Sequence, residues 1–358
     1  MKRHILPEPI PSIDLFVGID VHAKSWKTCI LTPQFEHKLF SSDPDPGVII
    51  DYLHRNFPSS SVKLVYEAGY FGFESARAFN AAGYHCMVVH PADIPSAHKE
   101  RDQKNDTVDA RKLAYNLRAG TIQGIHIPDE SKRAHYSLIL QRRFMVSQIG
   151  KIKKQIKAYL TFIGQKIDPN LTQRETISFS KRYQNWLREL PLLPAHRLIM
   201  DNYLKTISVL RQELLHLNKQ IRNLSRTPEY EREVQIMMSV PGIGLIGGMT
   251  ILTKIENFNR FKTNDQLCAM FGLIPSTSSS GAREVAYKIT NRGCKELRRI
   301  ILESAWVAIR VDPALCTRYH ELIKRMKPNQ AILRIARSMI NRIRTIMIND
   351  TPYQKAHY

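Results

Sequence analysis

The sequence predicts a mixed α/β domain followed by two helical parts, and three observations support this prediction. Strand and helix signals alternate through the first 120 residues, heptad-spaced apolar residues fill the middle, and short helical segments follow Pro228. The chain has 358 residues, 43% of them hydrophobic and 24% charged, which is enough for more than one packed core. We therefore expect three domains, at residues 1–130, 131–227 and 228–358.

The first domain contains short apolar or alternating segments, typical of strands, and segments with the three-to-four spacing of helices. The expected strands are Leu15–Ile19, Trp26–Leu31, His37–Phe40, Val62–Tyr66 and His85–Val89, and the expected helices are Val48–Phe57, Phe71–Ala82 and Lys104–Ala119. Three strands in a row, followed by strand–helix alternation, imply an antiparallel meander that continues into parallel βαβ units. This order predicts a mixed sheet and is similar to the ribonuclease H fold.

The middle of the chain carries two heptad seams. Their apolar residues, which recur at alternating steps of three and four, are Met145, Ile149, Ile152, Ile156, Tyr159 and Ile163, then Met200, Tyr203, Ile207, Leu210, Leu214, Leu217, Ile221 and Leu224. Such seams are typical of coiled coils. Because Pro169, Pro191 and Pro194 interrupt the helix between them, we expect a long antiparallel hairpin or an intermolecular coiled coil.

The last third is predicted to be mainly helical. Its segment Val240-Pro-Gly-Ile-Gly244 lies between two apolar helices and is similar to the turn of helix-hairpin-helix modules. Gly242 and Gly244 would allow a tight turn whose backbone N–H groups face a phosphate, next to a helix N-terminus. An ordinary helix–helix turn is the alternative.

Charge is distributed unevenly along the chain. Residues 1–130 hold 14 Lys and Arg against 16 Asp and Glu, whereas residues 131–358 hold 39 against 16. A neutral domain joined to a strongly basic remainder predicts a nucleic-acid-binding protein that carries a carboxylate-based site. The alternative is a basic protein whose charge serves solubility or association with ribosomes.

Other compositional features exclude several classes. No stretch approaches the length and apolarity of a membrane span, and the basic start of the chain lacks the apolar region of a signal peptide. The five cysteines are scattered and never spaced as Cys-x-x-Cys, which disfavours a disulfide framework or a zinc site. We expect a cytoplasmic protein in its reduced state, without membrane contact.

Four carboxylates stand where the predicted fold would bring them together. Asp20 ends the first strand, Glu67 follows the fourth, and Asp106 and Asp109 lie three residues apart on one helix face. Such charges repel one another unless cations neutralise them, so the set predicts Mg²⁺ or Mn²⁺. Two ions about 4 Å apart would suit phosphodiester exchange.

These residues carry a family resemblance. The segments Gly18-Ile-Asp-Val-His-Ala-Lys24, Tyr66-Glu-Ala-Gly69 and Lys104-Asn-Asp-Thr-Val-Asp-Ala110 resemble the DEDD motifs of a family of insertion-sequence transposases, which also contains the Piv-type DNA invertases. The resemblance implies a domain like that of the RuvC Holliday-junction resolvase. It also implies that Asp20, Glu67, Asp106 and Asp109 are catalytic metal ligands.

The same resemblance extends to a serine in the last third. Gly272-Leu-Ile-Pro-Ser-Thr-Ser-Ser-Ser-Gly281 is similar to the family segment in which the serine before a glycine becomes joined to DNA. This implies that the polar run is a catalytic loop and that Ser280, before Gly281, is its nucleophile, although Ser278 and Ser279 are equivalent candidates by chemistry alone. The cations expected to contact nucleic acid nearby are Arg283, Lys288, Arg292 and Lys295.

The resemblance also implies partners. Family members are understood to use a noncoding bridge RNA that pairs with donor and target DNA, and the basic region beyond residue 130 is compatible with that. Because the carboxylates and the serine fall in different domains, we expect a dimer or tetramer with composite sites.

Two alternatives use the same residues differently. A RuvC-like, metal-dependent endonuclease would attack Holliday junctions or other DNA with water, and would form no covalent adduct. A nucleic-acid-binding protein without activity is disfavoured by the complete carboxylate set, and a sugar-kinase-like ATPase by the lack of a glycine-rich loop after Asp20. The histidines His22, His85 and His90 have no spacing typical of a metal site, so we expect ordinary surface or core positions for them.

Overall fold

The computed structural model of the chain describes residues 13–69, 71–95, 106–280, 283–289 and 292–355, with backbone alone between 275 and 291. These residues form two compact units, one ending at Pro128 and the other beginning at Asp129. Each unit has its own hydrophobic core. The finer division into three domains stays a prediction.

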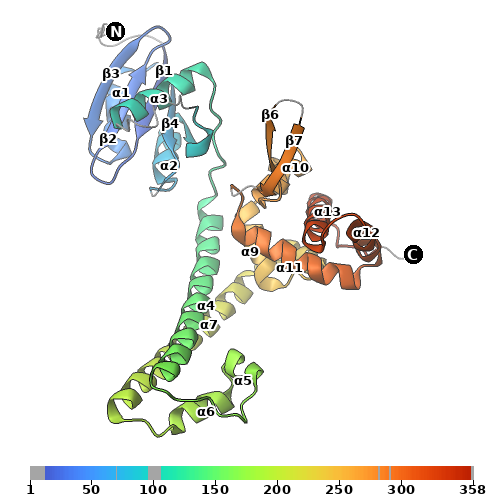
Figure 1. The fold of residues 1–358 in the computed structure, drawn as a ribbon. Coiled ribbons are helices and arrows are strands. Elements are labelled where there is room, and N and C mark those ends of the chain that lie inside the picture. The colour runs from blue at the N-terminus through green and yellow to red at the C-terminus, as the bar shows by residue number, and fades with distance from the viewer. Residues whose placement is uncertain (1–12, 70, 96–105, 281–282, 290–291, 356–358) are drawn as a thin grey trace. The chain divides into compact units, whose positions relative to one another are not determined.

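The first unit is built on a five-stranded mixed sheet with the strand order β3-β2-β1-β4-β5 (Figure 1). The strands are β1 (Asp14–Asp20), β2 (Trp26–Leu31), β3 (Glu36–Ser42), β4 (Ser61–Glu67) and β5 (His85–Val89). Strands β1 to β3 pair antiparallel, while β4 pairs in parallel with both β1 and β5. The prediction of a mixed sheet, with a meander leading into parallel strands, is confirmed.

Helices cover both faces of this sheet. They are α1 (Pro46–Asn56), α2 (Glu74–Ala81) and α3 (Asp106–Ala119). Leu15, Val17 and Ile19 of β1 belong to the core shared with α1 and α2. Since side chains alternate along a strand, the residues between them face α3. The described residues of the unit therefore form a three-layer sandwich, with α3 on one face of the sheet and α1 and α2 on the other.

Helix α3 approaches strand β1 at Gly18. A Cβ atom at this position would fall onto backbone atoms of Ala110 and Ala114, so helix and strand meet backbone to backbone. Arg111, the residue after Ala110, also fixes the helix to the sheet, because its guanidinium donates two hydrogen bonds of 2.9 Å to the carboxylate of Glu36 on β3. Glycine at position 18 thus sets how closely α3 lies against the sheet.

The second unit begins with two long helices, α4 (Glu130–Phe162) and α7 (Pro194–Leu224), that run antiparallel side by side (Figure 1). Arg142 Nε donates to Asn218 Oδ1 at 2.7 Å near one end, and the Tyr159 hydroxyl lies 2.7 Å from His196 Nδ1 near the other. This arrangement is the intramolecular hairpin, one of the two outcomes predicted from the heptad seams. Helices α5 (Gln173–Ser178) and α6 (Lys181–Glu189) pack at its far end.

A helical bundle with one small hairpin completes the unit. Its elements are α8 (Glu231–Ser239), α9 (Leu245–Ile255), η3 (Phe258–Arg260), α10 (Asn264–Met270), β6 (Pro275–Ser280), β7 (Arg283–Ile289), α11 (Lys295–Val311), α12 (Pro313–Ile323) and α13 (Pro328–Ile348). Helix α9 is apolar and buried over most of its length, within a core shared with α8, α11 and α13. Ile139 of α4 and Ile221 of α7 join this core. No helix among the described residues is long and apolar enough to cross a membrane.

We predict that Gly18→Ala lowers the free energy of unfolding of the first unit by about 1–3 kcal/mol, because the new methyl group would force α3 away from β1. The matched control is Gly150→Ala in α4, where a Cβ meets no atom within 4 Å. There the change should stabilise the helix by roughly 0.5–1 kcal/mol. Denaturant unfolding measures both, with Trp26 reporting on the first unit and Trp186 on the second; equal effects would contradict the backbone contact.

Candidate active site

Asp20, the last residue of β1, lies on the sheet face that α3 covers. Phe16 and Gly18 precede it at steps of two, and both contact the α3 side of the sheet. Its side chain is 15% exposed. The carboxylate therefore stands at the carboxyl end of a central strand, mostly withdrawn from water.

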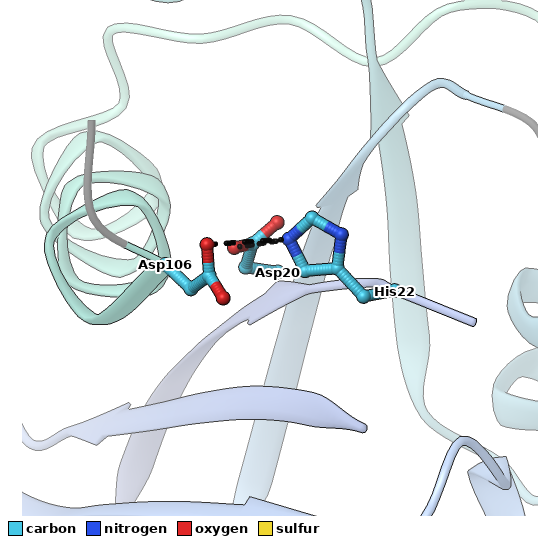
Figure 2. Close-up of side chains that lie close together, drawn as sticks. All are labelled: Asp20, His22 and Asp106. Carbon is cyan, nitrogen blue, oxygen red and sulfur yellow. Dashed lines mark hydrogen bonds and ion pairs between the residues drawn. The ribbon is translucent and has the colours of Figure 1, made fainter. Parts of the chain in front are cut away.

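The first turn of α3 brings the next carboxylates. Asp106 begins the helix and Asp109 follows three residues later, one residue before the Ala110 that packs on Gly18. Asp106 is exposed and Asp109 is half-buried. Because the helix meets the strand at Gly18, its amino-terminal turn comes close to Asp20 (Figure 2).

Three side chains converge at this point. His22 Nε2 lies 3.1 Å from an Asp20 carboxylate oxygen and 3.5 Å from an Asp106 oxygen. One potential ligand atom from each residue lies within 4.8 Å of the others (Figure 2). Two carboxylates and an imidazole are a donor set that suits a divalent cation.

The electrostatics of this group fit the same interpretation. Burial raises the pKa of Asp20, and the charges of Asp106 and Asp109 raise it further. His22 opposes this shift through its charge and its hydrogen bond. Ionised Asp20 is therefore unfavourable beside the other carboxylates, and a bound cation would relieve the repulsion.

Glu67 occupies the corresponding position on the neighbouring strand. It ends β4, and β1 and β4 pair in parallel up to Ile19 and Tyr66, so Glu67 and Asp20 leave the sheet at the same edge. Val65 belongs to the core under α3, and alternation places Glu67 on that face too. Glu67 and Asp109 lie outside the group of three ligand atoms, so the structure brings together two of the four predicted carboxylates at that distance.

His22 is the residue that the sequence analysis missed. It was expected to be an ordinary surface or core residue, but its ring contacts both Asp20 and Asp106. Its spacing gave no signal because the second contact comes from a helix more than 80 residues away in the chain. The one available signal was its position two residues after Asp20, within the same motif.

The serine segment belongs to the second unit and is a strand. The polar run that was expected to be a loop forms β6, which pairs antiparallel with β7. Ser280 ends β6 and pairs with Arg283, and Lys288 lies near the end of β7. Gly281 lies outside the described residues. Cross-strand pairing overrides the weak strand preference of a serine run.

Two glycines meet at the base of this hairpin. Gly272 has a φ of +67°, and a Cβ on Gly293 would fall onto the backbone of Gly272. Arg292 and Lys295 are exposed beside this crossing. The close glycine contact ties the two ends of the hairpin to the bundle.

A tight turn at Val240–Gly244 joins α8 to α9, as expected both for a helix-hairpin-helix module and for an ordinary helix–helix turn. Gly242 has a φ of +79°, and a Cβ there would lie 2.7 Å from Cα of Ser304 on α11. Ser304 also donates a hydrogen bond of 3.1 Å to the Gly242 carbonyl. Gly244 is the N-cap of α9, and no side chain caps that end.

Comparison with known proteins identifies a family. Residues 17–164 match the DEDD family of IS110 transposases, described as "Transposase", and residues 234–320 match the "Transposase IS116/IS110/IS902 family". The 43.6 kDa protein of insertion element IS110 from Streptomyces coelicolor is 30% identical to this chain over 394 residues, covering 96% of both proteins. The chain belongs to the IS110/IS116/IS902 family of transposases.

Two further relatives also carry the name transposase. The transposase for insertion sequence element IS1533 of Leptospira borgpetersenii is 24% identical over 304 residues, covering 82% of this chain and 84% of the relative. A Sinorhizobium fredii protein named as transposase y4qE is 28% identical over 246 residues, covering 68% of this chain. That match spans 58% of the relative, which is less than two thirds of its length.

Family membership confirms the coarser predictions. The chain is a member of a class of enzymes that cut and rejoin DNA, as the sequence analysis predicted. A DEDD transposase implies a ribonuclease H-like fold and the use of divalent metal, in agreement with the mixed sheet and the acidic group around Asp20. The serine, the particular metal and the RNA remain predictions.

We predict that Asp20→Asn stabilises the metal-free protein at pH 7.5, because it removes one of the mutually repelling carboxylates without changing shape. The gain should be on the order of 1 kcal/mol, the scale of two charges about 4 Å apart in water. Thermal unfolding in EDTA measures it. Mn²⁺ should raise the wild-type midpoint and leave the variant unchanged; a variant that is less stable in EDTA yet still stabilised by Mn²⁺ would contradict the site.

We predict that His22→Ala weakens Mn²⁺ binding at least about tenfold and Mg²⁺ binding less, because Mg²⁺ prefers oxygen ligands. Calorimetric titration of the full chain with each ion measures the two affinities. His85→Ala, at an exposed position on β5, is the matched control and should change neither. An equal loss for both ions would show that the imidazole acts through Asp20 and Asp106 instead.

Proposed function

We propose that this chain is the recombinase of a bacterial insertion sequence and that it exchanges DNA strands through a covalent bond to Ser280. The proposed metal site is supported by the convergence of Asp20 and Asp106 within the DEDD family match. The proposed nucleophile is supported by the position of Ser280 at the end of β6, next to the turn of the hairpin. The carboxylates and Ser280 belong to different units of the chain.

The proposed reaction conserves every phosphodiester bond. The Ser280 hydroxyl oxygen attacks a DNA phosphorus, its proton is lost, the bond to the 3′ oxygen breaks, and the released 3′ hydroxyl gains a proton. A 3′ hydroxyl from another strand then attacks the 5′-phosphoserine and returns the serine to its free form. Serine is a poor nucleophile at neutral pH, so this scheme needs an activating group.

Asp20, Glu67, Asp106 and Asp109 would hold the divalent cations, Mg²⁺ or Mn²⁺ and two in number. When bound, such ions supply Lewis-acid stabilisation of charge on phosphate oxygens. The carboxylates themselves fix the position of that charge at the carboxyl end of the sheet. His22 would offer an imidazole nitrogen as a further ligand beside Asp20 and Asp106.

The basic second unit would hold the nucleic acids. DNA of the element ends and target is the substrate, and a bridge RNA encoded by the element is the proposed guide. The residues proposed to contact them are Gly242, Gly244, Gly281, Arg283, Lys288, Arg292 and Lys295. Because carboxylates and serine lie in separate units, we propose a dimer or tetramer whose protomers share composite sites.

The second candidate function is a RuvC-like endonuclease with water as the nucleophile. The ribonuclease H-like family and the acidic group favour it as much as they favour the recombinase. The two functions differ in one product, since only the recombinase forms a protein–DNA adduct.

We predict that wild type, incubated with Mg²⁺, end-junction DNA and RNA transcribed from the element's flanks, forms a covalent protein–DNA band on a denaturing gel. Ser280→Ala should abolish the band because it removes the attacking oxygen, and Asp20→Ala should abolish it because it removes a metal ligand.

The matched controls for this assay are Ser278→Ala and Ser279→Ala, which should retain the band. If one of them lost it while Ser280→Ala kept it, the nucleophile would be reassigned within β6. Cleaved DNA with no covalent band in wild type would establish the endonuclease instead.

A further inference from the structure

A cleft of about 830 Å³ lies between the carboxyl-terminal part of α7 and the first turn of α9. Both walls belong to the second unit, and neither contains a carboxylate of the candidate metal site or a residue of the β6–β7 hairpin. The cleft is therefore a separate feature of the chain, and its chemistry can be considered by itself.

The α7 wall of the cleft is positively charged. Lys219 and Arg222 are spaced at i and i+3, so they share one face of α7, and Arg226 follows in the turn after the helix; all three line the cleft and are exposed. No Asp or Glu lines the cleft. Among the described residues, no acidic side chain forms an ion pair with any of these three cations. Three uncompensated positive charges thus face one hollow.

An adjoining cleft of about 250 Å³ provides a contrast within the same unit. Three arginines line it, and two of them have acidic partners: Arg143 pairs with Glu296 at 2.9 Å and Arg299 lies 3.5 Å from Glu303. Those charges are satisfied by the protein itself. The larger cleft, whose cations lack such partners, is the one suited to an external anion.

Positive charge also accumulates behind the cleft. Arg142 reaches from α4 to donate a hydrogen bond of 2.7 Å to Asn218, a residue of the cleft lining. Burial lowers the pKa of Arg142, and the charge of Arg299 lowers it further. A polyanion in the cleft would relieve this local excess of positive charge.

The opposite wall offers backbone instead of charge. Gly248 N donates to the Gly244 carbonyl as the first helical hydrogen bond of α9, so the N–H groups of residues 245–247 have no partner within the helix. Gly244 and Gly247 both line the cleft, and without side chains they let a ligand approach these groups. The cationic face and the open helix turn therefore look onto the same space.

We propose that this cleft binds the sugar–phosphate backbone of a nucleic acid, with Lys219, Arg222 and Arg226 contacting successive phosphates. Lys219 and Arg222 are about 4.5 Å apart along α7, at about 1.5 Å per residue, and Arg226 lies two residues beyond the end of that helix. Phosphates of one strand recur about every 3.4 Å along a duplex axis, so cations spaced this closely can contact neighbouring phosphates of a single strand. Contacts of this kind position a strand without reading its sequence. The inference rests on the proposed function in two respects, the ligand being a nucleic acid and Gly244 being one of its proposed contacts; the cationic side chains are new.

The test is equilibrium binding of the full chain to labelled duplex DNA and to single-stranded RNA of the same sequence, across a range of salt concentrations. The variant Lys219→Ala/Arg222→Ala/Arg226→Ala should weaken binding at least about tenfold and lower the salt slope by about two to three units, since each lost phosphate contact removes about 0.7 to 0.9. A loss confined to DNA or to RNA identifies which polymer occupies the cleft.

A matched control removes the same charges elsewhere. Arg310→Ala/Arg318→Ala/Lys324→Ala also deletes two arginines and one lysine, all exposed, from α11, α12 and the residue after α12. This variant should keep the wild-type slope. If both triple variants lose the same slope, or if the cleft variant keeps it for both probes, the cleft is not a nucleic-acid site and the proposal is overturned.

A second pair of variants guards against a folding artefact. Gly244 has a φ of −94°, and a Cβ there meets nothing within 4 Å, so both Gly244→Asp and Gly244→Ser should fold. Either residue is a good N-cap and should raise thermal stability. Only Asp brings a negative charge, so Gly244→Asp should bind more weakly than Gly244→Ser. Equal binding by the two would count against phosphate in the cleft.

This inference and the proposed reaction fail separately. The cleft variants are measured by affinity and salt slope, while the reaction is measured by the covalent band at saturating DNA. If wild type forms no covalent band but the cleft variant shows the predicted fall in salt slope, the serine mechanism is wrong and the cleft proposal stands. If wild type forms the band but the cleft variant keeps the wild-type slope, the serine mechanism stands and the cleft proposal is wrong.

Discussion

The candidate metal centre depends on the backbone contact between α3 and β1 at Gly18. With no side chain at this position, the helix lies directly on the strand at Ala110 and Ala114. Asp20 is two residues further along the same strand face, and Asp106 is one helical turn before Ala110. A single close approach therefore converts two positions that are far apart in the chain into neighbours.

This convergence has an electrostatic cost. Burial and the charges of Asp106 and Asp109 all raise the pKa of Asp20, so the group is poorly satisfied by protein alone, and His22 compensates only in part. Such unfavourable local electrostatics are typical of sites that bind a charged ligand. The surrounding contacts, including the paired hydrogen bonds from Arg111 to Glu36, hold α3 in place against that repulsion.

In the second unit, one helix serves two purposes. The middle and end of α9 are buried in the core of the bundle, while its first turn, beginning at Gly244, opens onto the cationic face of α7. The packing of Gly242 against Ser304 fixes where this turn lies. Burial of the rest of the helix thus makes its amino-terminal end rigid, which is what a phosphate-binding surface requires.

The sequence by itself determined the order of strands and helices in the first unit, its mixed sheet, the two long helices that carry the heptad seams, and the positions of Asp20, Glu67, Asp106 and Asp109 along their elements. These follow from periodicity and spacing, which are local properties. The tertiary structure alone decided that His22 joins Asp20 and Asp106, that the run before Gly281 is a strand, and that Lys219, Arg222 and Arg226 face α9. Each of these depends on pairing between segments distant in the chain, whose geometry local preferences do not contain.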